Sequence, residues 1–397
     1  MPVDTAAAVQ RLMHFLAVPG ITGEEAKIAK EIQAALKAAG VAPRFVKFDD
    51  VNTRIPVPTQ TGNLIVQLPG NGTMKTALPL LFMTHMDTVP LCAGAKPKQV
   101  GRKILNEANT ALGGDNRTGC AVLVSLAAEL ISQKPNHPPI TLLFTVREES
   151  GLFGARYLNP KELGDVAMGF NFDGRSAADV IVGAVGADRW EADITGKASH
   201  AGVAPERGIS ATMIFAVAMA EIRQRGWFGK VSKEGREGTS NIGSVGDAHG
   251  KSAGEATNVV TDYMHVKGES RSHNPKFVRE ITTAYKAAFD NALTKITDHE
   301  GKRGRVKFTV RADYHPFRMR DDAPVVVRTA AAVRKLNKEP NLRATNGGLD
   351  ANWMIKHGIP TVTLGAGQND IHTVKEWVDL AEFENAVKLA FLLATME

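Results

Sequence analysis

The sequence predicts an α/β protein with a mostly parallel sheet, into which a smaller α+β unit is inserted. Short, nearly continuous apolar runs are typical of strands buried on both faces, and they alternate with helical segments in the first 183 residues. The middle of the chain instead alternates charged and apolar residues, as half-exposed antiparallel strands do. We therefore expect a main domain formed by residues 1–186 and 314–397, and an inserted domain formed by residues 187–313.

Helices and strands of the main domain follow from periodicity and stop signals. Asp4 is a plausible N-cap for a helix over residues 4–16, and Gly40 ends a second helix over residues 23–39. Further helices are expected over residues 118–132, 324–336 and 382–395. Strands are expected over residues 44–51, 63–68, 78–84, 140–146, 167–172 and 361–364.

The inserted domain is expected to place two helices on one antiparallel sheet. Amphipathic patterns predict helices over residues 210–224 and 275–293. Alternating patterns predict strands over residues 189–195, 259–269 and 305–311.

Composition excludes several classes of function. The 48 basic and 42 acidic residues are interspersed and give a net charge of +6, and 6% of residues are aromatic, so no nucleic-acid partner is expected. Two cysteines, Cys92 and Cys120, cannot form a disulfide framework. The N-terminus lacks the pattern of a signal peptide, and no apolar run reaches about 18 residues, so we expect no membrane partner and a cytoplasmic location.

Acidic and imidazole side chains follow the predicted buried strands. One more, Asp115, comes after Gly113-Gly114, just before a predicted helix. Because the carboxyl ends of parallel strands share one edge of a sheet, we expect these side chains to converge in one crevice. They are two imidazoles and five carboxylates: His85, Asp87, Asp115, Glu148, Glu149, Asp173 and His372.

So many carboxylates cannot all ionise in a partly dry cleft unless protons or metal ions compensate their charge. Mixed histidine and carboxylate ligands suit Zn²⁺, with Co²⁺ or Mn²⁺ also possible. Three ligands per ion, with one carboxylate shared, form a two-metal hydrolytic site. One further carboxylate is then needed to accept the proton of the attacking water. Each residue alone is weak support for this site, and the joint pattern carries the prediction.

Six motifs in this sequence resemble those of the M20 metallopeptidase family, most closely its peptidase T-like branch. They occur in the family's order and cover nearly the whole chain. The motifs are Thr84-His85-Met86-Asp87-Thr88-Val89, Gly114-Asp115-Asn116-Arg117-Thr118-Gly119, Arg147-Glu148-Glu149-Ser150-Gly151, Asn171-Phe172-Asp173-Gly174, Ser199-His200-Ala201-Gly202 and Asp370-Ile371-His372-Thr373.

The resemblance implies a zinc-exopeptidase-like catalytic domain and a role for each converging residue. Asp115 would bridge two metal ions, His85 and Asp173 would complete one site, and Glu149 and His372 the other. Glu148 would be the general base that activates a metal-bridging water, and later the general acid. Asp87 would orient His85 through its second ring nitrogen. The peptide bond between Asp115 and Asn116 is expected to be cis.

The resemblance further implies that the inserted domain is a lid and dimerisation domain. His200 would stabilise the oxyanion, in its own active site or in that of a partner subunit. Asn258 and Arg271 would bind the substrate carbonyl or carboxylate. Gly347 and Gly348 would present backbone amides to the substrate, although Leu349 stands where relatives often have Ser or Thr.

The predicted function is a metal-dependent exopeptidase acting on short peptides, most similar to a tripeptide aminopeptidase of the peptidase T-like branch. The resemblance also implies a homodimer formed through the inserted domain. A carboxypeptidase or an N-acyl amino-acid amidohydrolase of the same family would share every metal ligand and stays open as an alternative. A non-catalytic binding protein on the same fold is the alternative from another class; it would lack Glu148 or a ligand, and both are present.

Overall fold

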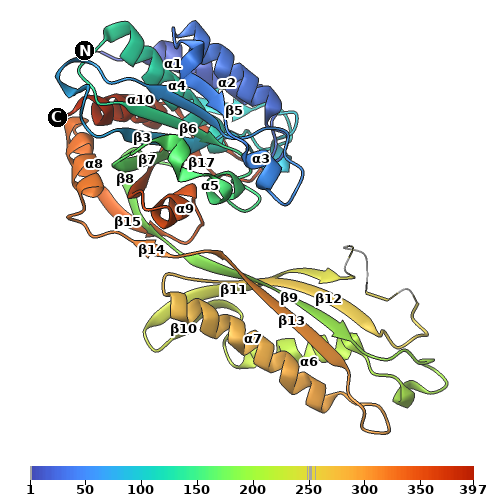
Figure 1. Ribbon diagram of the computed structural model, residues 1–397. Helices are drawn as coiled ribbons and strands as arrows, with labels where there is room; N and C mark the ends of the chain where they lie inside the picture. Colours follow the sequence, from blue (N-terminus) through green and yellow to red (C-terminus); the bar gives the residue numbers. More distant parts are fainter. Residues whose placement is uncertain (1, 248, 250–252, 255) are drawn as a thin grey trace. The chain divides into compact units, whose positions relative to one another are not determined.

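The chain forms two compact units, each described here by itself. The computed structural model describes residues 2–247, 249, 253–254 and 256–397 (Figure 1). The first unit contains the chain up to Gly183, then Arg318–Thr345 and Leu349–Glu397. The second contains Ala184–Phe317 and Asn346–Gly348.

A nine-stranded sheet forms the middle layer of the first unit. Its strand order is β1-β2-β6-β3-β7-β16-β8-β14, and β15 pairs with β8. The four central strands β6, β3, β7 and β16 run parallel, whereas β2 and β8 pair antiparallel with their inner neighbours. The strands are β1 (Val46–Phe48), β2 (Leu64–Leu68), β3 (Leu80–His85), β6 (Ile140–Thr145), β7 (Met168–Phe172), β8 (Asp179–Ala184), β14 (Phe317–Arg318), β15 (Asn341–Thr345) and β16 (Thr361–Leu364).

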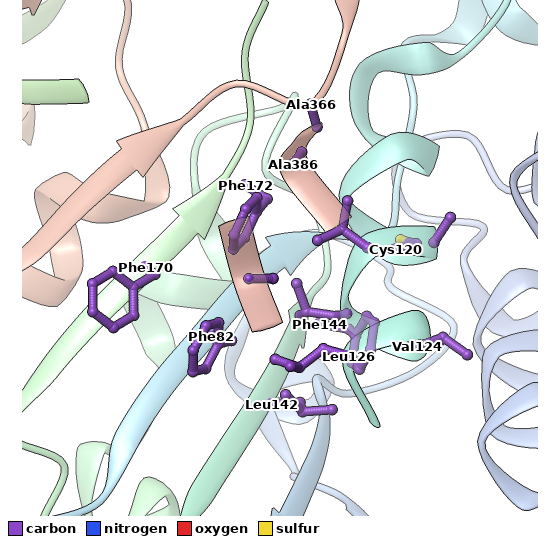
Figure 2. Close-up of a cluster of buried hydrophobic side chains, with 14 of the residues drawn as sticks. Phe82, Cys120, Val124, Leu126, Leu142, Phe144, Phe170, Phe172, Ala366 and Ala386 are labelled. Carbon is purple, nitrogen blue, oxygen red and sulfur yellow. The ribbon is translucent and has the colours of Figure 1, made fainter. Parts of the chain in front are cut away.

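Helices cover both faces of this sheet. Alternation along β3 sends Phe82 into the larger apolar cluster, which includes α1, α2, α4, α8 and α10, and sends Leu81 and Met83 into a smaller cluster with α9. Figure 2 shows part of the larger cluster, with Phe82 and Phe170 on the strands to one side and Cys120 and Val124 on α4 to the other. The helices are α1 (Thr5–Leu16), α2 (Ala26–Ala38), α3 (Val51–Arg54), α4 (Gly114–Gln133), α5 (Phe153–Tyr157), α8 (Pro324–Lys335), α9 (Asp350–Lys356) and α10 (Leu380–Thr395).

A small four-stranded sheet in the first unit has the order β17-β18-β5-β4. Its strands are β4 (Pro97–Val100), β5 (Lys103–Asn106), β17 (Gln368–Asn369) and β18 (Trp377–Asp379).

The described residues also form five short 3₁₀ helices, four in the first unit and the last in the second: η1 (Pro43–Phe45), η2 (Gly72–Met74), η3 (Pro90–Cys92), η4 (Pro160–Leu163) and η5 (Pro205–Arg207).

The second unit is a five-stranded antiparallel sheet with two helices, α6 and α7, on one face (Figure 1). Trp190 of β9 is fully buried on the helical face, where a side chain at Gly268 would collide with its ring. The strand order is β10-β11-β12-β9-β13. The elements are β9 (Gly186–Thr195), α6 (Ala211–Gln224), β10 (Gly229–Lys233), β11 (Arg236–Gly246), β12 (Tyr263–Ser272), α7 (Pro275–Lys295) and β13 (Arg305–Tyr314).

This architecture confirms the predicted α/β class with an inserted α+β unit, and it corrects several elements. Residues 44–51 do not form one strand: after β1, Asp49 accepts hydrogen bonds from the Val51 and Asn63 amides, which turns the chain into α3. The second predicted strand of the insert, expected over residues 259–269, begins at Tyr263 rather than Val259. Nine strands of the described chain were not predicted, because most of them are short, polar or interrupted by glycine and lack a clear alternation: β4, β5, β8, β10, β11, β14, β15, β17 and β18.

The bounds of the two units differ from the predicted domain bounds at three places. Residues 184–186, residues 314–317 and Asn346–Gly348 were expected in the main domain and belong to the second unit. A side chain at Gly348 would overlap the Tyr314 ring, so only glycine permits this close approach. Among the described residues, no helix combines the length and the hydropathy that a bilayer span requires.

Candidate metal centre

Three adjacent parallel strands deliver four of the candidate side chains to one edge of the sheet. His85 is the last residue of β3, Glu148 and Glu149 follow β6, and Asp173 follows β7. Strand β3 pairs in parallel with both β6 and β7, so their carboxyl ends lie side by side.

Asp115 reaches this edge from the start of α4. A side chain at Gly119 would meet Thr84 Oγ1 and the Phe172 carbonyl, so glycine lets α4 approach the ends of β3 and β7. Asn116 donates a hydrogen bond to the same Phe172 carbonyl at 2.8 Å. The peptide bond between Asp115 and Asn116 is cis, which confirms that expectation.

The two carboxylate oxygens of Asp115 face two different imidazoles. Oδ1 lies 3.0 Å from His85 Nε2, and Oδ2 lies 3.2 Å from His372 Nε2. Asp173 Oδ1 lies 3.8 Å from His85 Nε2, and Glu149 Oε1 lies 3.0 Å from His372 Nε2. The side chains thus form two groups that share Asp115.

Two overlapping sets of side chains around His85 bring their ligand atoms close enough together to bind an ion. One set that could hold a metal is His85, Asp115 and Glu149, whose ligand atoms all lie within 4.8 Å of one another. A second set, by the same measure, is His85, Glu148 and Asp173. Glu148 therefore lies beside the group that contains His85.

Asp87 holds both the imidazole and the loop after β6. His85 Nδ1 lies 3.1 Å from the Asp87 carbonyl oxygen and 3.3 Å from Asp87 Oδ1. Both atoms are acceptors, so Nδ1 carries the proton of a neutral ring and Nε2 is left to bind a cation. The Asp87 carboxylate also accepts hydrogen bonds from the backbone amides of Glu148 and Glu149, at 3.1 and 3.2 Å.

Electrostatic strain is concentrated in this cluster. Burial and the neighbouring carboxylates raise the pKa of Glu148 well above its ordinary value, although the charge of His85 opposes this shift. Burial raises the pKa of Glu149 to about 7. Hydrogen bonds to Asp115 and Glu149 raise the pKa of His372 to about 10. Carboxylates and imidazoles therefore compete for protons in the metal-free protein.

The residues present fit a pair of divalent cations. In the part of the chain that the structure describes, none of the five carboxylates forms an ion pair with Lys or Arg. The neighbouring buried Arg117 donates instead to the backbone carbonyls of Met86, Val18 and Gly20. Among the described residues, the basic groups that pair directly with these carboxylates are the two imidazoles. Mixed imidazole and carboxylate donors are those that Zn²⁺ prefers.

The other predicted site residues lie in the second unit, where they occupy opposite ends of the sheet. His200 is exposed, and its Nδ1 accepts hydrogen bonds from the Gly202 and Val203 amides at 3.1 Å each. The Asn258 carbonyl accepts from the Ala201 amide beside it. These residues lie beyond the Tyr263 end of β12, whereas Arg271 is near its other end.

Gly347 and Gly348 belong to the Arg271 end of this unit. Gly348 packs against Tyr314, and Tyr314 and Arg271 both pair with Ala187 of β9. With a rise of about 3.3 Å per residue, the eight residues from Tyr263 to Arg271 span roughly 26 Å. His200 and Arg271 of one chain are therefore too far apart to touch one short peptide.

Three buried acidic residues near the cluster were not predicted from the sequence. Glu376 accepts hydrogen bonds from backbone amides next to Asp115, and Glu25 accepts one from the Arg147 amide. Asp350 approaches Thr145 at the end of β6. Acidic residues that have apolar residues nearby in the chain could have been noted in the sequence. Nothing there, however, distinguishes a buried carboxylate of this kind from one on the surface.

An α/β unit with histidines and carboxylates at the carboxyl edge of its sheet is typical of a metal-dependent hydrolase. The family model for peptidase family M20/M25/M40 matches residues 81–395. The chain therefore belongs to this family, as its motifs indicated.

Individual relatives agree with this assignment over nearly the whole chain. The uncharacterized protein YqjE of Bacillus subtilis is 30% identical over 388 residues, which cover 98% of this chain and 97% of that protein. The crystal structure of the aminopeptidase PepT from Bacillus cereus has a TM-score of 0.82 and 30% identity, covering 99% of this chain and 98% of that one. A tripeptidase from Staphylococcus aureus has a TM-score of 0.85 and 28% identity, with the same coverage.

Proposed function

We propose that this protein is a metal-dependent exopeptidase that releases the N-terminal residue of short peptides, tripeptides above all. The observation that carries the hydrolytic part is the placement of His85 and His372 on opposite oxygens of Asp115. The preference for tripeptides is supported by similarity to the aminopeptidase PepT of B. cereus and the tripeptidase of S. aureus.

Five side chains would hold two divalent ions, most readily Zn²⁺, with Co²⁺ or Mn²⁺ as further candidates. Asp115 would be shared, His85 and Asp173 would complete one site, and Glu149 and His372 would complete the other. Bound ions would polarise the substrate carbonyl and lower the pKa of a water molecule.

Glu148 is the residue proposed to move the proton. It lies next to His85 and Asp173, and the two ligand sets proposed above, which share Asp115, do not include it. Glu148 would accept a proton from the attacking water and then donate it to the departing amine. The backbone of Glu148 is held by Asp87, because the Asp87 carboxylate accepts a hydrogen bond from the Glu148 amide.

His200 is suited to donate a hydrogen bond to the oxyanion. Because two backbone amides point at its Nδ1, the neutral ring carries its proton on Nε2. A proton placed there is available to an oxygen that gains negative charge in the transition state. Since His200 and Arg271 of one chain are far apart, we propose that His200 and Asn258 act on the active site of a second subunit.

The second unit has features suited to pairing with a second copy of the chain. Strand β13 is at an edge of the five-stranded sheet, and such an edge offers unpaired backbone groups. Helix α6 is largely apolar, and Met213 on it is 50% exposed. We therefore propose a homodimer formed through this unit.

A hydrolysis panel tests the proposed function. The panel compares the tripeptide Leu-Gly-Ala, its N-acetyl derivative and the dipeptide Leu-Gly, each with Zn²⁺, Co²⁺ or Mn²⁺ and with a chelator. We expect free Leu and Gly-Ala from the unmodified tripeptide, and no product after verified metal removal. Preferred cleavage of the N-acetyl peptide would indicate a carboxypeptidase or an amidohydrolase instead. No cleavage of any peptide by the metal-loaded protein would favour a binding protein.

A further inference from the structure

Glu376 is a buried carboxylate that none of the roles above includes. It lies four residues after His372, and it is 3% exposed. The loop that carries His372 therefore also carries a buried carboxylate, that of Glu376.

The Glu376 carboxylate is surrounded by the backbone that leads into Asp115. Oε2 accepts hydrogen bonds from the Leu112 and Gly113 amides, both at 2.8 Å, and Oε1 accepts one from the Asp115 amide at 3.1 Å. Gly113 has a φ of 83°, a left-handed conformation that glycine adopts without a steric penalty. Successive amides can then converge on one anion.

The His372 loop has little regular structure of its own. Asp370 and His372 both have positive φ angles, 50° and 62°, which are uncommon for residues with a side chain. Thr373 Oγ1 donates to the Asp370 carbonyl, and the Glu376 amide donates to the Thr373 carbonyl. Such a backbone persists only where surrounding contacts fix it. The three bonds to Glu376 fix it directly against the segment of the shared ligand, Asp115.

We propose that Glu376 is a positioning residue that holds the His372 loop against the Asp115 segment, and that it thereby sets the affinity of the centre for metal at the site containing His372. This inference rests on the proposed two-metal function. The His85 site depends less on Glu376, because β3 and Asp87 hold His85 independently.

Glu376→Gln tests the proposal with little change in volume. A glutamine has one acceptor oxygen for three amides, and its NH₂ group would oppose an N–H donor. Glu382→Gln is the matched control, since Glu382 also accepts a backbone hydrogen bond, from Ala177 at 2.9 Å, and this bond involves neither the Asp115 segment nor the His372 loop. Zn²⁺ affinity is measured by titrating metal-free protein against a chromophoric chelator, with circular dichroism and thermal unfolding as checks on folding.

We expect the unchanged protein to bind two ions and Glu376→Gln to bind one of them about 10–100-fold more weakly, as loss of a ligand-orienting contact does. Glu382→Gln should retain both affinities. If Glu376→Gln folds and binds both ions as tightly as the unchanged protein, the inference is wrong. If it does not fold, the shorter Glu376→Asp decides: we expect a smaller loss in the same direction, and equal affinity overturns the inference. Failure of the unchanged protein to bind two ions would instead contradict the proposed function.

Discussion

The two imidazoles of the proposed metal centre lie in opposite surroundings. The side chain of His85 is 2% exposed, ends a buried strand, and has its second ring nitrogen against Asp87. The side chain of His372 is 47% exposed and comes from a loop with two positive φ angles. Both nevertheless approach the same carboxylate, Asp115, within 3.2 Å.

This contrast teaches that the two halves of one centre are positioned by different physical means. The sheet positions His85, because strand pairing and burial leave its backbone few alternatives. His372 depends on side-chain contacts to a neighbouring loop, of which those of Glu376 are the most numerous. We expect substitutions in the His85 half to lower the free energy of unfolding. Substitutions in the His372 half should instead weaken metal binding.

The largest effect is expected at the adjacent pair Glu148 and Glu149, which belong to different halves. Glu148→Gln removes the proposed base but no ligand, so kcat should fall by roughly 10³–10⁴-fold while both ions stay bound. Glu149→Gln should instead weaken binding of one ion. Tripeptide kinetics and metal content per chain measure both. Turnover of Glu148→Gln close to that of the parent would exclude Glu148 as the base.

His200→Ala tests a contribution from outside both halves. Loss of one oxyanion donor typically costs about 10²–10³-fold in kcat, and metal content should not change. Mixing His200→Ala with Glu148→Gln under conditions of subunit exchange tests the source of His200. In a two-fold dimer where His200 serves the partner, the mixture regains about a quarter of parental activity. If His200 acts within its own chain, no activity returns.

The stability of the metal-free protein distinguishes the two histidines. His85→Ala leaves buried carboxylates without their partner and should lower the free energy of unfolding by about 3 kcal/mol. His372→Ala removes a half-exposed contact, which should cost about 1 kcal/mol or less. Urea denaturation of both variants, stripped of metal, measures the difference. If both variants lose the same free energy of unfolding, the distinction between a His85 half held by the sheet and a His372 half held by a loop is wrong.

The smallest effect expected is a pH dependence of metal binding. In the metal-free protein, hydrogen bonds to Asp115 and Glu149 raise the pKa of His372 to about 10, so this ring is protonated at neutral pH, and the neighbouring carboxylates raise the pKa of His85 as well. A metal ion must displace the His372 proton, so Zn²⁺ affinity should rise with pH from neutral pH to about pH 10 and binding should release protons. Calorimetry in two buffers with different ionisation enthalpies counts the protons. Affinity that falls as pH rises would contradict this picture.

Much of the fold and the convergence of the candidate site residues could be predicted because buried parallel strands have a strong sequence signal. The apolar runs before His85, Glu148 and Asp173 indicated the strands, and the topology rule placed their ends together. The strands β10 and β11 gave no such signal, because their hairpin is rich in glycine and charged residues.

The contacts behind the ligands could not be predicted. Nothing in the sequence indicates that Glu376 folds back on the Asp115 segment, because the contact joins residues 261 positions apart. The distance between His200 and Arg271 could not be predicted either, because it depends on the register of β9 and β12. Long-range register and loop conformation are tertiary properties that local patterns do not encode.

Anomalous X-ray diffraction at the zinc edge, from crystals of the zinc-loaded protein, tests the central claim most directly. We predict two peaks, one on each side of Asp115, with His85 next to one and His372 next to the other. A single peak, or peaks away from Asp115, would contradict the two-metal centre.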